Sequence, residues 1–209
     1  MNKYITEFIG TMFLVLVVGV AAIGGTAGPF APWAIGGILM TMIFAGGHIS
    51  GAHYNPAITL AVLIRGRINL GTAITYWIAQ IGGAILAWAI AKFVFHVEGT
   101  GASALRSVKQ GLVAEILGTF ALAYVMLNVA TAKAHPSNSF YGLAIGFTVA
   151  ACAFTFGGIS GGAFNPSVAL GATLLKGFAL ADFWVYLIGC FAGGALAGFA
   201  FIFLNPDDK

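Results

Sequence analysis

The segment SGAHYNPAITLA at residues 50–61 recurs 110 residues later as SGGAFNPSVALG at residues 160–171. Each copy places an Asn-Pro pair inside an apolar stretch, where proline would break a helix that had already begun. Proline is tolerated at the first position of a new helix, and asparagine just before it is a favoured N-cap. We therefore expect two short helices, over 55–64 and 165–175, that begin in the middle of apolar surroundings.

Those surroundings have the composition of a membrane-embedded chain. Of the 209 residues, 60% are hydrophobic and 7% are charged, whereas soluble domains carry about 25% charged residues. A net charge of +3 is too small to indicate a nucleic-acid surface, and Cys152 and Cys190 lack the spacing of metal ligands. Crossing the bilayer takes about 20 apolar residues, and six runs meet this length, at 5–25, 33–51, 72–95, 112–132, 139–157 and 183–204.

The internal repeat covers the whole chain, which we treat as one domain over 1–209. TEFIGTMFL near the start matches AEILGTFAL in the second half, and the match aligns Glu7 with Glu115. Repeat 1 (1–97) and repeat 2 (108–209) each hold three spans, so the two halves must lie in the membrane with opposite orientations. The predicted fold is an all-α membrane protein with six transmembrane helices and two re-entrant half-helices. Inverted repeats of this kind place their functional site near the bilayer midplane, at the discontinuous helices.

The irregular segments SGAHY and SGGAF lead into the Asn-Pro pairs. Irregular backbone survives at membrane depth only inside protein or beside a water-filled cavity. Two half-helices that enter from opposite faces would bring Asn55 and Asn165 together at the centre, where the positive helix ends oppose cations.

These residues resemble the aquaporin family, the major intrinsic proteins, over the whole chain. The two boxes, the repeated E-x-x-G-T starts and YWIAQIGGA at 76–84 carry the resemblance. It implies a right-handed six-helix bundle in the cell membrane, with cytoplasmic termini, a pore in each subunit of a homotetramer, and passage of water and small neutral solutes. It implies no enzyme activity, cofactor or metal. The box residues are Asn55, Pro56, Ala57, Asn165, Pro166 and Ser167.

The resemblance also assigns the lining of the pore. A ladder of backbone carbonyls is expected from Gly51, Ala52, His53, Gly161, Gly162 and Ala163. Family spacing assigns the selectivity filter to Ile35, Ala153, Gly162 and Val168, with Cys152 as the alternative to Ala153. Most members have arginine where this chain has Val168, so we expect a wide, apolar filter. Filters without arginine resemble those of some bacterial members linked to arsenic resistance. Water, glycerol, urea, ammonia, metalloid hydroxides and arsenicals all remain candidate solutes.

Glu7 and Glu115 are acids inside apolar spans, and such residues are functional suspects. They could relay protons in a proton-coupled secondary transporter, or each could clamp an irregular loop by accepting backbone N–H bonds. One glutamate in each half favours the clamp. An intramembrane serine protease is a remote alternative, because GISG at 158–161 resembles a rhomboid motif. That family's histidine follows its serine, however, and no histidine follows His135.

Overall fold

The computed structural model describes residues 1–99 and 105–208. Over these residues the chain is helical, without strands. The long helices are α1 (Asn2–Val17), α2 (Ala31–Ser50), α4 (Leu70–Ala89), α5 (Val108–Thr131), α6 (Tyr141–Ser160) and α8 (Phe183–Leu204). The half-helices are α3 (Pro56–Ile64) and α7 (Pro166–Leu174). Helices α1 and α4 continue into π-helical turns over Val18–Ile23 and Ile90–Val94.

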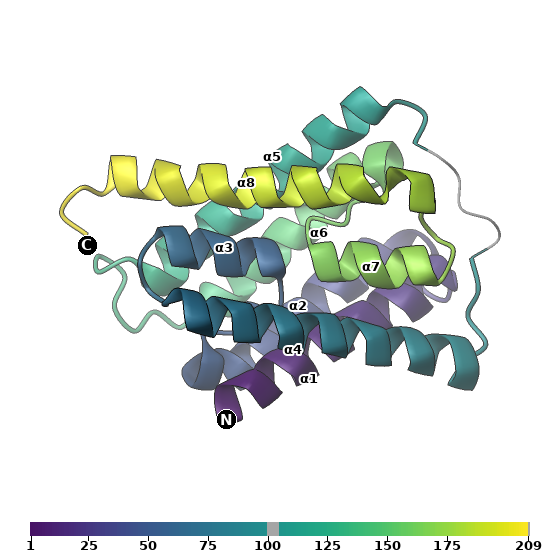
Figure 1. Ribbon diagram of the computed structural model, residues 1–209, viewed down its shortest axis with the longest axis horizontal. Helices are drawn as coiled ribbons and strands as arrows, with labels where there is room; N and C mark the ends of the chain where they lie inside the picture. The colour runs from purple at the N-terminus through teal and green to yellow at the C-terminus, as the bar shows by residue number, and fades with distance from the viewer. Residues whose placement is uncertain (100–104, 209) are drawn as a thin grey trace.

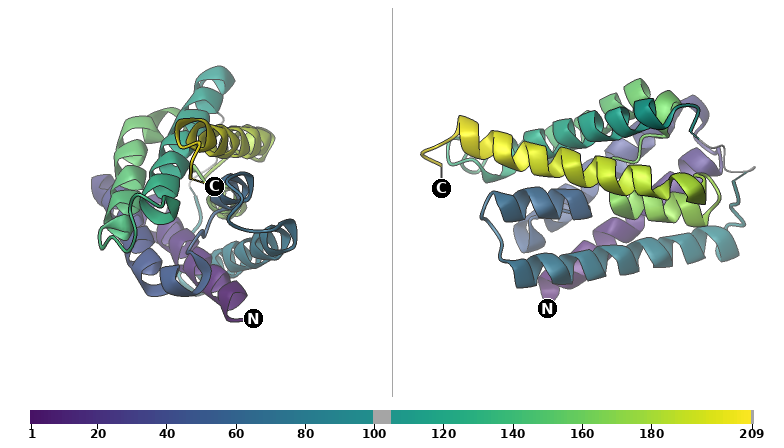
Figure 2. Two further views of the ribbon diagram at one scale, coloured as in Figure 1. Left: turned by 90° about the vertical axis from the view of Figure 1, so that its left-hand side faces the viewer. Right: turned by 45° about the horizontal axis from the view of Figure 1, so that its top comes forward.

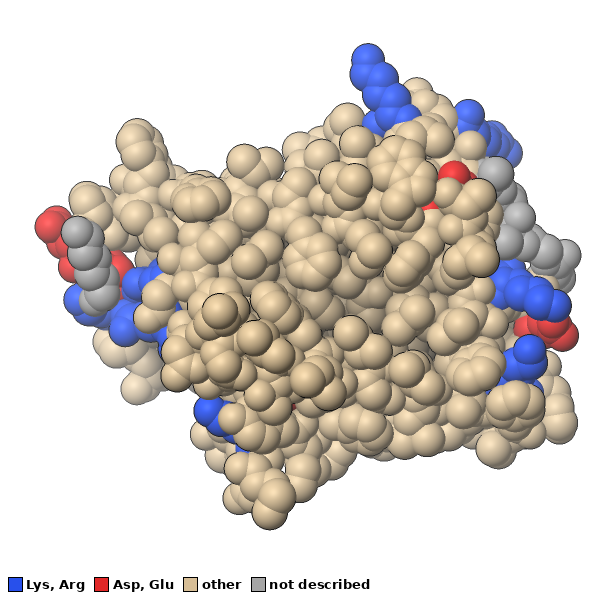
Figure 3. Space-filling view, viewed as in Figure 1, with Lys and Arg blue, Asp and Glu red and all other residues tan. Residues whose placement is uncertain are grey.

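The long helices confirm the predicted spans. In the described part of the chain, six helical stretches are long and apolar enough to cross a membrane. Charged side chains gather at the two ends of the molecule and leave an uncharged face between them (Figure 3). Large apolar side chains remain exposed along this face, as expected where lipid or another subunit replaces water. The chain is therefore a multi-pass membrane protein.

The two halves repeat the same packing. Helix α1 packs along α4 in the first half, and α5 packs along α8 in the second. Helices α2 and α6 join the halves, and Gly36 and Gly146 let their backbones approach: a β-carbon added to either would lie 2.5 Å from the other's carbonyl oxygen. The half-helices lie end to end, with their first residues toward the centre (Figure 1).

A glycine turns the chain toward each half-helix. Gly51 follows the last residue of α2 and Gly161 follows the last residue of α6, with φ angles of 84° and 91°. This left-handed conformation is the usual glycine C-cap. Each long helix therefore stops abruptly, and a loop of three residues carries the chain to Asn55 or Asn165.

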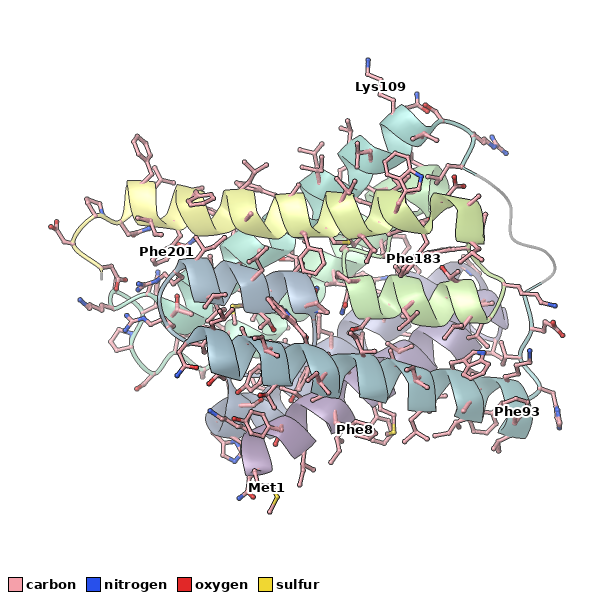
Figure 4. The ribbon with its side chains drawn as sticks, viewed as in Figure 1. Met1, Phe8, Phe93, Lys109, Phe183 and Phe201 are labelled. Atoms are coloured by element: carbon pink, nitrogen blue, oxygen red, sulfur yellow. The ribbon has the colours of Figure 1, made fainter. Side chains whose placement is uncertain are left out.

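Both termini lie toward one end of the molecule (Figure 2). Lys3 Nζ lies 3.4 Å from Thr72 Oγ1 at the start of α4. At the same end the Asp208 carboxylate accepts a hydrogen bond of 2.6 Å from Arg65. The Arg65 guanidinium also lies 4.4 Å from the centre of the Phe201 ring, on the α8 segment nearest the C-terminus (Figure 4).

Candidate functional site, a lumen between two half-helices

The two Asn-Pro loops brace each other. Asn55 Nδ2 donates to the Phe164 carbonyl at 2.8 Å, and Asn165 Nδ2 donates to the Tyr54 carbonyl at 2.9 Å. Each asparagine also caps its own half-helix, because its Oδ1 accepts the N–H of the residue two positions later. One N–H of each amide is therefore committed to the opposite loop, and the second is left for a ligand.

Glu7 holds the first loop from behind. Its Oε1 accepts from the Ser50 hydroxyl at 2.7 Å and from the His53 N–H at 2.9 Å. Its Oε2 accepts from the Tyr54 N–H at 2.7 Å and from Gln80 Nε2 at 2.9 Å. With four partners and no exposed surface, this carboxylate clamps the loop backbone.

Glu115 does the same for the second loop. It accepts from Ser160 Oγ at 2.6 Å and from the N–H groups of Ala163 and Phe164 at 3.0 and 2.7 Å. The fourth partner differs, because Cys190 Sγ lies 3.5 Å away where the first half has Gln80. Cys190 is thus part of a polar contact as well as a buried side chain.

The clamps hold backbone that a free chain avoids. Tyr54 and Phe164 both have a φ of 49°, in the left-handed region where a residue with a β-carbon costs about 1 to 2 kcal/mol. Both N–H groups donate 2.7 Å hydrogen bonds to a glutamate. Charge-assisted bonds of this length are strong enough to offset that strain.

A narrow cavity of about 80 Å³ runs between the half-helices and is called the lumen here. Within the described residues its polar side chains are His53, Asn55 and Asn165, and it has no charged side chain. Its other lining residues are Leu14, Val18, Ala22, Ile23, Ile35, Leu39, Ile43, Ala52, Ile58, Leu122, Met126, Ile145, Val149, Gly161, Gly162, Ala163, Val168, Ala172 and Phe178.

A wider cavity of about 810 Å³, called the vestibule here, adjoins the lumen at the end that holds the termini. Four residues line both spaces, which therefore lie side by side: Ile43, His53, Met126 and Ile145. Basic side chains from the α3–α4 and α5–α6 connections, Arg67 and Lys133, also line the vestibule. The wide vestibule thus carries basic side chains, whereas the narrow lumen beside it carries none among the described residues.

The predicted ladder residues divide between these spaces. Gly51 lines the vestibule, His53 lines both, and the other four line the lumen. Of the predicted filter, Ile35, Gly162 and Val168 line the lumen. Helix α6 contributes Val149, one turn before Ala153, and neither Ala153 nor Cys152 is among the lining residues. The assignment of Ala153 stays a prediction.

Known proteins share this arrangement and sequence. The family described as "MIP: Major intrinsic protein" matches residues 1–201. This chain belongs to the major intrinsic protein family. A glycerol uptake facilitator protein-like 6 of Lactiplantibacillus plantarum is 37% identical to it, with each chain fully covered. A probable aquaporin NIP4-2 of Arabidopsis thaliana is 35% identical over all of this chain and 76% of its own length.

The fold has a solved counterpart. The X-ray structure of the aquaglyceroporin from Plasmodium falciparum superposes with a TM-score of 0.83. It covers 96% of this chain and 94% of its own, at 24% identity. As a major intrinsic protein, the chain is a passive channel for water and small solutes and not an enzyme.

The geometry also separates this major intrinsic protein from a protease. Ser50 and Ser160 each donate the hydroxyl proton to a glutamate, and a nucleophilic serine needs a histidine in that place. In the described residues no three His, Cys, Asp or Glu side chains group as metal ligands would.

Two contributors to the site were not singled out from the sequence. Gln80 and Thr59 are both fully buried behind the first loop. Gln80 Nε2 donates to Glu7 at 2.9 Å, and Thr59 Oγ1 lies 3.0 Å from His53 Nδ1. The available signal was a glutamine in the middle of an apolar span, where an unpaired polar side chain is costly. The two asparagine side chains brace the opposite loops by donating to the backbone carbonyls of Phe164 and Tyr54. A contact to a backbone carbonyl leaves no signal in the sequence.

Proposed function

We propose that this protein is a passive channel of the cell membrane that conducts water together with larger neutral solutes. The solute class is small molecules with hydroxyl or amide groups, such as glycerol and urea, and uncharged metalloid hydroxides or methylated arsenicals. Conduction runs through one pore in each subunit of a homotetramer with its termini in the cytoplasm. The filter consists of Ile35, Ala153, Gly162 and Val168.

One observation carries the choice of solute: Val168 lines the lumen and brings no charge or hydrogen-bond donor to it. An arginine there would supply a fixed positive charge and five donors, and its long side chain would narrow the passage. Valine leaves the space open and apolar, which suits the carbon skeleton of a polyol. The name of the Lactiplantibacillus relative, a glycerol uptake facilitator-like protein, agrees with this solute class.

Passive conduction is favoured over proton-coupled transport by the surroundings of the two glutamates. Neither Glu7 nor Glu115 lines the lumen or the vestibule. Each is fully buried, with its oxygens engaged by loop groups. A proton carrier needs a carboxylate that can meet the solute path. Uptake that does not respond to an imposed pH gradient distinguishes the channel from the carrier.

The test is the Val168→Arg variant in proteoliposomes, with swelling rates recorded for water, glycerol, urea and arsenous acid. We expect the glycerol and arsenous acid rates to fall at least about tenfold relative to water flux. A tenfold change corresponds to about 1.4 kcal/mol, well within the reach of one new charge and a narrower opening. The Arg side chain can be solvated by loop carbonyls and lumen water, which limits the penalty of burying it.

Val168→Met is the matched control, because it lengthens the side chain without adding charge or donors. Each variant counts as folded if it elutes as the same assembled species as the wild type and keeps the wild-type helical circular dichroism spectrum. If folded Val168→Arg keeps the wild-type ratios among all four solutes, Val168 does not control entry and the proposed selectivity is wrong. If vesicles that contain the wild-type protein swell no faster than empty vesicles, the proposal of a channel is itself wrong.

A further inference from the structure

A group of polar side chains lies directly behind the lumen in the first half only. His53 Nδ1 is 3.0 Å from Thr59 Oγ1, and Gln80 Nε2 is 2.9 Å from the same oxygen. All three side chains are buried. The repeat-equivalent positions in the second half hold Ala163, Ala169 and Cys190, so the group is not required by the shared fold.

Gln80 has a fixed orientation in this group. Its Nε2 lies 2.9 Å from both Glu7 Oε2 and Thr59 Oγ1. Turning the amide over would place its carbonyl oxygen against a carboxylate oxygen, and neither can donate. Gln80 therefore donates one proton to Glu7 and the other to Thr59.

The Thr59 hydroxyl decides which histidine nitrogen carries the proton. The hydroxyl can donate once and accept twice, and it has three contacts: Gln80, His53 Nδ1 and the Asn55 carbonyl at 3.1 Å. If Thr59 donates to the carbonyl, it can accept from Gln80 and from a protonated His53 Nδ1, and all three contacts are hydrogen bonds. If Thr59 donates to His53 instead, Thr59 Oγ1 and the Asn55 carbonyl oxygen lie 3.1 Å apart with no proton between them. The first arrangement satisfies every contact.

The rest of the His53 ring faces the solute path. His53 lines both the lumen and the vestibule, and among the described residues its ring makes a hydrogen bond through Nδ1 and none through Nε2. Tyr76 holds the ring edge-on, with centroids 5.1 Å apart, and is itself fixed by donating to the Ser50 carbonyl at 2.7 Å. The ring thus has one orientation, with Nδ1 toward Thr59 and Nε2 toward the passage.

We propose that Thr59 and Gln80 hold His53 in the Nδ1–H tautomer, which makes His53 Nε2 a hydrogen-bond acceptor at the junction of vestibule and lumen. His53 is then a specificity-determining residue, and Thr59 and Gln80 are positioning residues. The selectivity part of this inference rests on the proposed channel function; the tautomer does not. A solute that can donate a hydrogen bond is accepted at this junction. A similar solute that has acceptors but no donors cannot form a hydrogen bond there, because its acceptor faces the lone pair of His53 Nε2.

The first test reads the tautomer directly and needs no transport. His48, His96 and His135 are exposed and are replaced by glutamine, so that nitrogen-15 spectra of the protein in lipid bilayers report His53 alone. Near neutral pH we expect a protonated Nδ1 and an unprotonated Nε2. Thr59→Ser keeps the hydroxyl and should keep this pattern, whereas Thr59→Val should shift the ring toward the Nε2–H form. A wild-type His53 with Nε2 protonated overturns the inference.

The matched control is Thr11→Val. Thr11 is as buried as Thr59, but its hydroxyl has no partner. Thr11→Val therefore removes a buried hydroxyl without removing any hydrogen bond to His53, and the His53 spectrum should not change. A shift of the His53 signals in Thr11→Val would mean that Thr59→Val acts through general loosening of the bundle, which also contradicts the inference.

The second test measures selectivity by the ratio of formamide to dimethylformamide permeability, corrected for empty vesicles. Formamide has N–H donors and dimethylformamide has none. One lost hydrogen bond predicts a ratio about fivefold lower in Thr59→Val, with Thr59→Ser and Thr11→Val at the wild-type ratio. An unchanged ratio in a Thr59→Val protein whose tautomer has shifted overturns the role in selectivity. If the wild type conducts neither amide, the proposed function fails for amides, and the nitrogen-15 spectra still decide the tautomer.

Discussion

The two Asn-Pro loops have nearly the same backbone and different rings facing the lumen. In the first half, Tyr76 packs edge-on against the polar ring of His53, with centroids 5.1 Å apart. In the second half the equivalent tyrosine, Tyr186, stacks on Phe178 at 4.5 Å, and Phe178 lines the lumen from the opposite side. Each tyrosine also donates to the carbonyl of a serine, Ser50 or Ser160.

This contrast separates what the repeat keeps from what it varies. The glutamate clamps, the asparagine caps and the tyrosine–serine bonds occur in both halves because they fix backbone that is otherwise strained. The ring presented to a solute is not part of that support. At the end of the molecule that holds the termini this ring is the polar His53, and at the opposite end it is the apolar Phe178. A symmetrical scaffold therefore encloses an asymmetrical passage.

The largest expected effect tests whether the two clamps are equal. Glu7→Leu leaves four buried donors without their acceptor, and Glu115→Leu leaves three strong donors and a weak thiol. At about 1 kcal/mol or more for each orphaned donor, we expect losses of at least about 4 and 3 kcal/mol. Thermal unfolding midpoints in mild detergent measure both. Thr11→Val is the control, since its hydroxyl is buried without a partner, and a midpoint for either glutamate variant as high as that of Thr11→Val would contradict the clamp.

A smaller effect tests whether the two asparagines are equivalent. Asn55→Asp and Asn165→Asp each remove the Nδ2 donor to the opposite loop and place a negative charge beside the positive ends of both half-helices. We expect cation conductance in planar bilayers to rise about tenfold in both variants, because the barrier loses on the order of 1.4 kcal/mol. If cation conductance rises in only one of the two variants, the barrier to cations is formed by that half of the protein alone. Conductance at the wild-type level in both would show that it lies elsewhere.

The smallest effect compares the ion pairs beyond the two half-helices. Beyond α3, Asp208 pairs with the buried Arg65; beyond α7, Glu98 pairs with the exposed Lys176. Desolvation alone would raise the pKa of Asp208, but the Lys133 N–H and Arg65 lower it below its ordinary 3.8. The Lys176 hydrogen bond lowers the pKa of Glu98 in the same way. Because both values are lowered on folding, each pair stabilises the protein above the unfolded pKa, and this contribution disappears as pH falls through the folded pKa.

Melting midpoints across an acid titration therefore separate the two pairs. We expect Asp208→Asn to lower the midpoint near neutral pH and to match the wild type only once the pH has fallen below the folded pKa of Asp208, which itself lies below 3.8. Glu98→Gln should differ from the wild type by less at every pH, because exposed ion pairs contribute little. A larger loss from Glu98→Gln would reverse the ranking of the two ends.

The sequence was sufficient for the fold because its signals were local and doubled. An Asn-Pro pair with a glycine before it and a set of three apolar runs occur once in each half. The half-helices begin one residue from the predicted positions. The rotation of α6 could not be predicted in the same way. A helix that is apolar on every face has no stripe to indicate which side meets the lumen, so Val149 and Ala153 could not be told apart. Phe178 was missed for a related reason, since one aromatic residue in an apolar connection does not stand out.

The bonds between the asparagines and the opposite loops also bear on biosynthesis. Asn55 precedes its partner Phe164 by 109 positions. At about 5 to 20 residues per second, the ribosome takes roughly 5 to 22 s to make the second loop after the first has been inserted. During that interval the first half-helix has its glutamate but not its brace, and its polar backbone must be sheltered by the translocon or by water. The order of synthesis thus makes the first half, α1 to α4, an intermediate that is completed only when the second half is inserted in the opposite orientation.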